Sequence, residues 1–388
     1  MSGEGQIVLE GLHYETGKPV RVTIRGEKIQ QVEESAQEAK ANLPWIAPGL
    51  VDLQINGYYG VDFNTLPLTK EAVQKVTRQI AELGVTSYYP TVITNSSEDI
   101  EQLVGIIADA CSSDPLTGQC IAGIHIEGPF ISPEDGARGA HGKQFVMAPD
   151  WELFLKWQRA ADGRIRIITL SPEWDNAPEF IAKCSASGVT VSIGHTSATP
   201  EQIRAAVAAG ARMSTHLGNG AQLMLPRHPN YIWEQLASDE LSPCAIADGF
   251  HLPESVLKVF LKAKAEQLII VSDAVFLSGM APGEYDTHIG GKVVLTPEGR
   301  LHTAANPNIL AGSAQMLPFN IEHLVRTKLC TANQAWEMAS TRPAAFMGMP
   351  AAQGLAEGAP ADLVLYTWQG DKLDIHNVFK NGNQIHSH

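Results

Sequence analysis

The feature that most constrains the fold of this chain is an alternation of short apolar runs with longer amphipathic stretches through its middle. Eight apolar runs occur between residues 45 and 274, each of a length typical of a buried β-strand. The segments between them, such as 70–84 and 199–210, carry apolar residues at helical spacing. Eight strand–helix units are the number found in a TIM-type (β/α)8 barrel. A doubly wound open sheet alternates in the same way and is the structural alternative.

Polar side chains at the ends of the apolar runs favour the barrel. The runs end in these residues: Gln54 and Asn56, Glu127, His195, His216, His251 and Asp273. In a barrel, the carboxyl ends of all strands meet at one rim, so that residues far apart in the sequence converge there. An open sheet would spread them along an edge. We therefore predict an α/β fold built on a TIM-type barrel.

Both ends of the chain have a different pattern from the middle. Residues 6–35 and 354–385 contain short clusters of β-forming residues between glycines and charged turns. The pattern predicts that both ends pair into one small β-sandwich domain, formed by residues 1–47 and 352–388, beside a barrel formed by 48–351. Two unrelated terminal hairpins are the alternative.

Composition narrows the class of protein. A formal net charge of −14 over 388 residues argues against non-specific nucleic-acid binding, which needs a basic surface. Five scattered cysteines without a C-x-x-C motif do not form a disulfide framework or a thiolate zinc site. The chain has neither a recognisable signal peptide nor an apolar run of the roughly 20 residues that span a bilayer. We therefore expect a cytoplasmic protein with neither a membrane nor a nucleic-acid partner.

Three strand-end residues together suggest a metal site. Each of Glu127, His195 and His216 alone is more typical of a structural residue, satisfied by hydrogen bonds. Together they lie at the ends of predicted strands, and a carboxylate with two imidazoles suits zinc or iron. Three protein ligands leave a position open for water. Asp273, after the last apolar run, could take a proton from such a water or could simply cap the next helix.

The order and spacing of the motifs resemble a known family over nearly the whole chain. The matching segments are A-P-G-L-V-D-L-Q-I-N-G, H-I-E-G-P-F, S-I-G-H-T-S-A, S-T-H-L-G-N, I-A-D-G-F-H, V-S-D-A and L-A-G-S. The chain resembles the N-acetylglucosamine-6-phosphate deacetylases of the amidohydrolase superfamily. The resemblance implies hydrolysis of N-acetylglucosamine 6-phosphate to glucosamine 6-phosphate and acetate, a homodimer, and one divalent metal per chain, with zinc expected and iron(II) as an alternative.

The resemblance also assigns roles to individual residues. It implies that Glu127, His195 and His216 hold the metal, that Asp273 is the general acid–base, and that His251 polarises the acetamido carbonyl. It further implies these substrate contacts: Ala140, His141, Asn219, Gly220, Arg227 for the 6-phosphate, and Leu310. From the residues alone, Arg227 in L-P-R-H-P-N is equally consistent with a solvated surface arginine, although its planar fork suits phosphate.

Three departures from the superfamily pattern affect these expectations. Many amidohydrolases carry H-x-H at the end of the first strand, where this chain has Gln54 and Asn56. Neutral amides are poor zinc ligands, so we predict a single metal and expect the amides to bond a water or orient Glu127. N-G-A at 219–221 replaces the N-A-M that is more common in the family. The sequence therefore does not predict the detailed shape of the sugar pocket. No lysine stands where a bridging ligand would be expected.

Other functions remain possible at this stage. Deacetylation of the galactosamine epimer differs from the expected reaction at one hydroxyl, and the sequence does not separate the two. Hydrolysis of a cyclic amide usually uses the two-metal site whose histidines are missing here. A barrel that has lost catalysis and only binds a partner would typically have lost its metal ligands as well, whereas all three are present.

Overall fold

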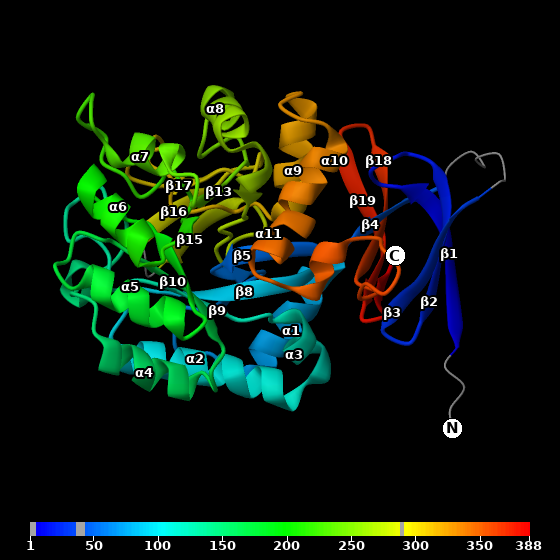
Figure 1. The fold of residues 1–388 in the computed structure, drawn as a ribbon, viewed down its shortest axis with the longest axis horizontal. Coiled ribbons are helices and arrows are strands. Elements are labelled where there is room, and N and C mark those ends of the chain that lie inside the picture. The colour runs from blue at the N-terminus through cyan, green and yellow to red at the C-terminus, as the bar shows by residue number, and fades with distance from the viewer. Residues whose placement is uncertain (1–4, 36–42, 288–290) are drawn as a thin grey trace.

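The computed structural model describes residues 5–35, 43–287 and 291–388. Its centre is a parallel barrel of eight strands surrounded by helices (Figure 1). The barrel strands are β5 (Leu50–Ile55), β8 (Val85–Ile93), β9 (Ile124–Glu127), β10 (Ile165–Leu170), β11 (Thr190–Ile193), β12 (Met213–Ser214), β13 (Ser242–Ala245) and β14 (Ile269–Ile270). Each of them coincides, to within one residue at its start, with part of one of the eight apolar runs seen in the sequence.

The helices follow the strands in the order expected for a (β/α)8 barrel. They are α1 (Lys70–Glu82), α2 (Ser97–Ser113), α3 (Pro115–Cys120), α4 (Trp151–Ala160), α5 (Ala177–Ala186), α6 (Pro200–Ala209), α7 (Tyr231–Ala237), α8 (Glu254–Lys264), α9 (Leu317–Arg326), α10 (Ala332–Met338) and α11 (Thr341–Phe346). Three short 3-10 turns are η1 (Lys143–Phe145), η2 (Ala265–Gln267) and η3 (Pro350–Gln353). In the described part of the chain, no helix has both the length and the apolar character needed to cross a membrane.

Local sequence explains the limits of these helices, as α6 illustrates. Thr199 caps its first turn, and Gln202 completes a capping box by bonding back to the backbone of Thr199. Pro200 occupies the first turn, where its missing N–H costs nothing. Gly210 ends the helix with φ of 118°, a conformation that glycine adopts without strain.

The barrel closes where the last strand meets the first. The backbone N–H of Asp273 donates to the carbonyl oxygen of Gln54 at 3.0 Å, and Ala274 pairs with Ile55 in parallel. The predicted barrel is therefore confirmed, and the open-sheet alternative is wrong. Its interior is filled by buried apolar side chains such as Val51, Ile167 and Val271, while a second, larger core packs the strands against the helices.

Both ends of the chain form one sheet beside the barrel. Its strands are β1 (Gln6–His13), β2 (Pro19–Arg25), β3 (Lys28–Glu34), β4 (Trp45–Pro48), β18 (Leu363–Gln369), β19 (Lys372–Lys380) and β20 (Asn383–Ser387). The order is β20-β19-β18-β4-β1-β2-β3, so N-terminal and C-terminal strands lie side by side (Figure 1). A small terminal β domain is thus present, and its strands belong to one continuous hydrogen-bonded sheet. The division of the chain after residues 47 and 351 stays a prediction.

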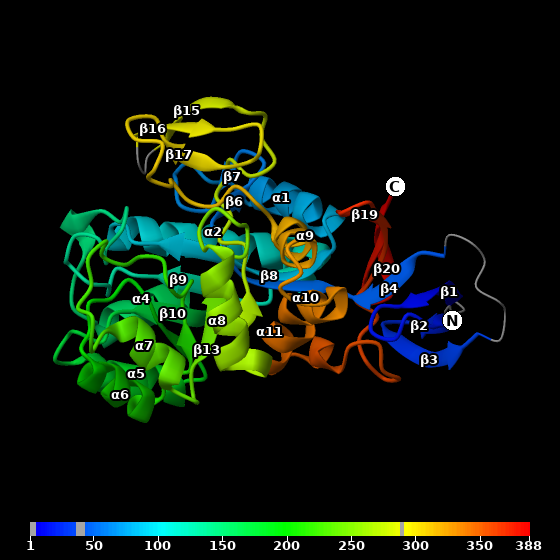
Figure 2. The ribbon, with the colours of Figure 1, turned by 90° about the horizontal axis from the view of Figure 1, so that it is seen from above.

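A second small sheet stands over one end of the barrel and was not expected from the sequence. It consists of β15 (Gly283–Thr287), β16 (Gly291–Leu295) and β17 (Leu301–Thr303), and Figure 2 shows it displaced from the barrel body. A hairpin of β6 (Gly57–Tyr58) and β7 (Val61–Asp62) follows the first barrel strand. The three-stranded sheet has its own small core and contributes residues to the pocket described below.

Candidate metal centre and substrate pocket

The strand-end residues converge on a cavity of about 300 Å³ at the rim of the barrel. The predicted site residues that line it are Glu127, Ala140, His141, His195, His216, Asn219, Gly220, His251, Asp273 and Leu310. Ten of the eleven predicted residues are therefore brought together. The remaining one, Arg227, lies exposed on the loop before α7 and is not among the pocket-lining residues.

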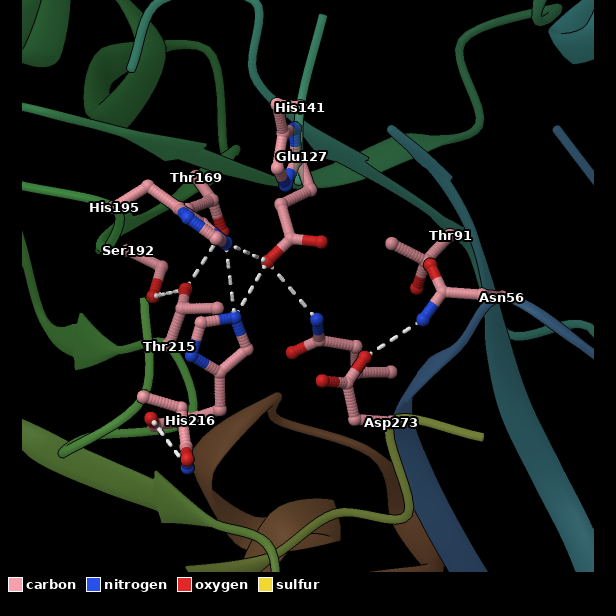
Figure 3. A network of polar contacts seen from close by, with 12 residues as sticks. Asn56, Thr91, Glu127, His141, Thr169, Ser192, His195, Thr215, His216 and Asp273 are labelled. Atoms are coloured by element: carbon pink, nitrogen blue, oxygen red, sulfur yellow. Dashed lines mark hydrogen bonds and ion pairs between the residues drawn. The ribbon is translucent and has the colours of Figure 1, made fainter. Parts of the chain in front are cut away.

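The three predicted metal ligands are in mutual contact at the bottom of the pocket. Oε1 of Glu127 lies 2.9 Å from Nε2 of His216 and 3.3 Å from Nε2 of His195, and the two Nε2 atoms are 3.1 Å apart. Figure 3 shows the Glu127 carboxylate to one side of the two rings, with a contact to a nitrogen of each. Ligands of a tetrahedral zinc ion with bonds of roughly 2.0–2.1 Å are about 3.3 Å apart. The three donor atoms therefore fit one divalent cation.

Hydrogen bonds behind the ligands orient them for metal binding. Nδ1 of His195 lies 2.9 Å from the carbonyl oxygen of Ala137, so Nδ1 carries the proton and Nε2 offers its lone pair. Nε2 of Gln54 donates to Oε1 of Glu127 at 3.0 Å. The amide of Gln54 thus orients Glu127, which is one of the two roles expected for the amides, whereas Asn56 donates to Asp273 instead.

The electrostatics of the cluster favour a positive charge at its centre. Burial lowers the pKa of His216, but the hydrogen bond and the charge of Glu127 outweigh burial and raise this pKa to about 9. His195 and His216 together hold the pKa of Glu127 well below its usual range, although burial alone would raise it. A divalent cation would supply this charge and take the place of the proton, since metal ligands bind in their deprotonated forms.

His141 is a further nitrogen donor close to the three ligands. One ligand atom from each of Glu127, His141 and His195 lies within 4.8 Å of the others, so these residues form a second possible ligand set. Nδ1 of His141 is 2.8 Å from Oγ1 of Thr94, and burial lowers the pKa of His141 to about 3. The set with His216 has closer contacts, between 2.9 and 3.3 Å, and we therefore favour it as the metal centre.

Asp273 lies across the pocket from the three metal ligands. It is held by the side-chain amide of Asn56, which directly follows barrel strand β5. Nδ2 of Asn56 donates to Oδ1 of Asp273 at 2.7 Å (Figure 3). Burial raises the pKa of Asp273 to about 6, although the nearby His216 and His251 oppose this shift. A carboxyl group with a pKa close to neutral can both accept and return a proton.

The backbone at these residues is strained in a way typical of functional sites. His195, His216 and Asp273 have φ of 47°, 27° and 49°, values that residues other than glycine rarely adopt. Gly220, at φ of 56°, lies against the ring of His195, where an added Cβ would be 2.7 Å from Nδ1. Two predicted metal ligands and Asp273 thus share an unusual backbone conformation at the rim, and the ring of His195 needs a glycine at position 220.

Several residues of the site could not be identified from the sequence. Asp248, in the quoted I-A-D-G-F-H segment, accepts a 2.8 Å hydrogen bond from Nδ1 of His251, and the i, i+3 spacing was its only signal. Thr287 and Leu301 line the pocket from the three-stranded sheet. His125, which shares a strand with Glu127, bonds to Leu53 and Thr169 inside the barrel and is not among the pocket-lining residues.

Comparison with known proteins agrees with this geometry. Residues 45–385 match the family model described as the amidohydrolase family. N-acetylglucosamine-6-phosphate deacetylase of Caenorhabditis elegans is 33% identical over 334 residues, which cover 82% of this chain and 78% of that protein. The enzyme of the same name from Homo sapiens is 32% identical over 353 residues, covering 88% and 83%. The chain belongs to the N-acetylglucosamine-6-phosphate deacetylase family of amidohydrolases.

Solved structures of this family share the whole fold. The crystal structure of N-acetyl-D-glucosamine-6-phosphate deacetylase from Mycobacterium smegmatis is 27% identical, with a TM-score of 0.84 and coverage of 98% of this chain and 99% of that one. A mutant of the same enzyme in complex with N-acetyl-D-glucosamine-6-phosphate superposes equally well, with a TM-score of 0.84 and 26% identity. The family resemblance seen in the sequence is therefore confirmed, as is the barrel fold.

Proposed function

We propose that this amidohydrolase hydrolyses N-acetyl-D-glucosamine 6-phosphate to D-glucosamine 6-phosphate and acetate. The observation that carries the proposal is the cluster of the buried Glu127, His195 and His216 with the partly buried Asp273 in the pocket of a chain of this family. A barrel that only binds a partner does not require four ionisable groups arranged for metal binding and proton transfer.

The residues of the pocket have complementary tasks in this reaction. A divalent metal held by Glu127, His195 and His216 would activate a water molecule and polarise the amide carbonyl. Asp273 accepts the proton of the attacking water and then donates it to the leaving amine. His251 donates a hydrogen bond to the carbonyl oxygen as negative charge develops there.

We propose one metal per chain, with zinc favoured and iron(II) as the alternative. Two imidazoles and one carboxylate suit both ions. Gln54 and Asn56 donate their amide hydrogens to Glu127 and Asp273, so these two side chains support the carboxylates and offer only neutral oxygens to a second ion.

The test of the proposed reaction is an assay of acetate release from the phosphorylated sugar. We expect rapid release from N-acetylglucosamine 6-phosphate and poor release from plain N-acetylglucosamine. The galactosamine epimer, assayed at the same time, decides which sugar the pocket prefers by its kcat/KM. No acetate from either phosphorylated sugar would overturn the proposal.

The location of the protein is a separate question, and a cytoplasmic location stays a prediction.

The phosphate site of the proposed substrate needs a residue from outside the pocket. Among the residues that the structure describes, the pocket lining includes no lysine or arginine. Arg227 lies on a loop that also exposes Leu223 and Met224, which are 102% and 87% accessible. Neighbouring apolar side chains that are this exposed form a surface that contact with another protein would cover. We therefore propose a homodimer in which the Arg227 loop of one copy reaches the pocket of the other.

Two variants test this arrangement. Arg227→Ala should lower kcat/KM for the phosphorylated sugar by about 10- to 100-fold, the effect of losing a charge-assisted contact, and should leave the unphosphorylated sugar unaffected. Asp273→Asn should be inactive on both sugars. If the partner supplies Arg227, then co-expression of the two variants restores activity in mixed dimers. Without restoration, Arg227 either acts within its own chain or has no part in the phosphate site.

A further inference from the structure

Asp248 is a buried carboxylate beside the pocket that has no role in the mechanism above. It lies on the loop after β13 and is 2% exposed. Its Oδ1 accepts hydrogen bonds from the backbone N–H groups of Phe250 and His251, each at 2.9 Å. Its Oδ2 lies 2.8 Å from Nδ1 of His251. Both oxygens are therefore occupied, and one of them is bonded to the ring of a pocket residue.

The loop that carries this pair is held from behind by α9. Oδ1 of Asn320 accepts a hydrogen bond from the backbone N–H of Ala247 at 2.7 Å. Gly249, at φ of 77°, packs so closely on His323 that an added Cβ would lie 2.4 Å from the ring. Asp248 and His251 thus have a fixed relation to each other and to the pocket.

The hydrogen bonds determine where the ring of His251 carries a proton. Burial would raise the pKa of Asp248, but the hydrogen bond and charge of His251, together with the two backbone N–H groups, hold this pKa below its usual value. An ionised carboxylate can only accept hydrogen bonds. Nδ1 of His251 must therefore be the donor in the 2.8 Å contact.

This proton position limits what His251 can do on its pocket side. With a proton on Nδ1, a neutral ring has a bare Nε2, which cannot donate to a carbonyl oxygen. Only the imidazolium form has an Nε2–H as well. Asp248 is the carboxylate in contact with Nδ1 that balances the charge of this form, and Asp273 also interacts electrostatically with His251.

We propose that Asp248 is a positioning residue that holds His251 in the Nδ1–H form, so that His251 acts on the substrate as an imidazolium donor from Nε2. The role of the donor rests on the proposed deacetylase function. The proton position does not, and it can be measured without substrate.

Asp248→Asn tests the proton position directly. The amide oxygen can still accept the two backbone N–H groups, so the loop keeps its turn, but the amide nitrogen then donates towards Nδ1 of His251. We expect ¹⁵N NMR of the zinc-loaded enzyme to show a protonated Nδ1 in the wild type and an Nε2–H tautomer in the variant. The His251 signals are assigned by their loss in His251→Gln. A bare Nδ1 in the wild type, or an unchanged ring in Asp248→Asn, would overturn the proposal.

A double-mutant cycle tests whether Asp248 acts through His251. Loss of a donor to a developing oxyanion lowers kcat by about 10²- to 10³-fold, which we expect for His251→Leu, whose side chain has no donor. Asp248→Asn keeps a neutral donor, so we expect a smaller loss of about 10- to 100-fold in kcat with little change in KM. The double variant should be no slower than His251→Leu alone. Additive losses would show that Asp248 supports the loop independently. Absence of acetate release by the wild type would overturn the proposed function, and the NMR result would then decide the role of Asp248.

Discussion

Two buried charged clusters in this molecule serve different purposes. At the barrel rim, Glu127 contacts two histidines and Asp273 lies nearby. Between the barrel and the terminal sheet, Lys380 forms a 2.8 Å ion pair with Asp362 and donates to Ser87. Asp362 also accepts from the backbone N–H of Asn381 at 2.8 Å. The three rim residues other than Asp273 are as buried as Lys380 and Asp362, so burial of charge does not by itself distinguish a functional site.

The completeness of the hydrogen bonding does distinguish them. In the described part of the chain, the rim cluster contains buried polar atoms without a partner: Oε1 of Gln54, Oδ1 of Asn56 and Nδ1 of His216. The side-chain atoms of Lys380 and Asp362 are not among the unpartnered ones. Unsatisfied groups are costly to bury and persist where a ligand or a reaction uses them. This difference supports the proposed role of the rim in binding and catalysis, and a structural role of the Lys380 pair in joining the terminal sheet to the barrel.

The largest effect expected from this comparison is on turnover at the rim. Asp273→Asn should lower kcat by about 10²- to 10⁴-fold, the range for loss of a general acid–base group, while metal binding and the unfolding midpoint remain close to those of the wild type. The steady-state rate of acetate release and the metal content of the same sample measure both quantities. Turnover equal to that of the wild type would assign the proton transfer to another group.

Loss of an ion-pair partner in the Lys380–Asp362 cluster should lower stability and leave turnover unchanged, which is the opposite of the effect at the rim. Lys380→Met leaves the buried Asp362 without its partner and should lower the free energy of unfolding by about 3–5 kcal/mol without changing kcat. Lys18→Met is a matched control beside the same sheet, because Lys18, which directly precedes β2, forms a solvent-exposed ion pair with Glu34 of β3. Urea unfolding of both variants measures the difference. Equal stability of the two would contradict a structural role for the Lys380 pair.

A smaller effect is expected from the residue that orients Glu127. Gln54→Leu removes the hydrogen bond to Oε1 of Glu127 and should weaken metal binding by about 10- to 100-fold, as is typical for loss of a partner of a metal ligand. Competition with a chelator of known affinity measures the change. Gln74→Leu, on the outside of the barrel, is the control for the substitution itself. Unchanged affinity would mean that Glu127 needs no support from Gln54.

The convergence of the candidate site residues could be predicted from the sequence because a barrel brings the ends of its strands together at one rim. Glu127, His195, His216 and Asp273 each end an apolar run, and closure of the barrel alone brings them together. The pairing of both termini in one sheet was also visible, since both have the same pattern of short strands.

Other parts of the site depend on contacts that periodicity does not encode. The three-stranded sheet that places Thr287 and Leu301 in the pocket is an insertion after the last barrel strand. The partnership of Asp248 and His251 depends on the loop turn between them. The position of Arg227 relative to the pocket depends on the course of a surface loop. In our proposal it also depends on how two copies of the chain pack together. Side chains at strand ends could therefore be predicted, whereas those on loops could not.

The most direct test of the account is the number of metal ions that each chain holds and needs. The central claim is that Glu127, His195 and His216 bind one catalytic metal, while Gln54 and Asn56 support the carboxylates. Metal analysis of protein purified without added metal should give close to one ion per chain. Removal of that ion should abolish acetate release, and one equivalent of zinc should restore it. Two tightly held ions per chain, both needed for turnover, would contradict the claim.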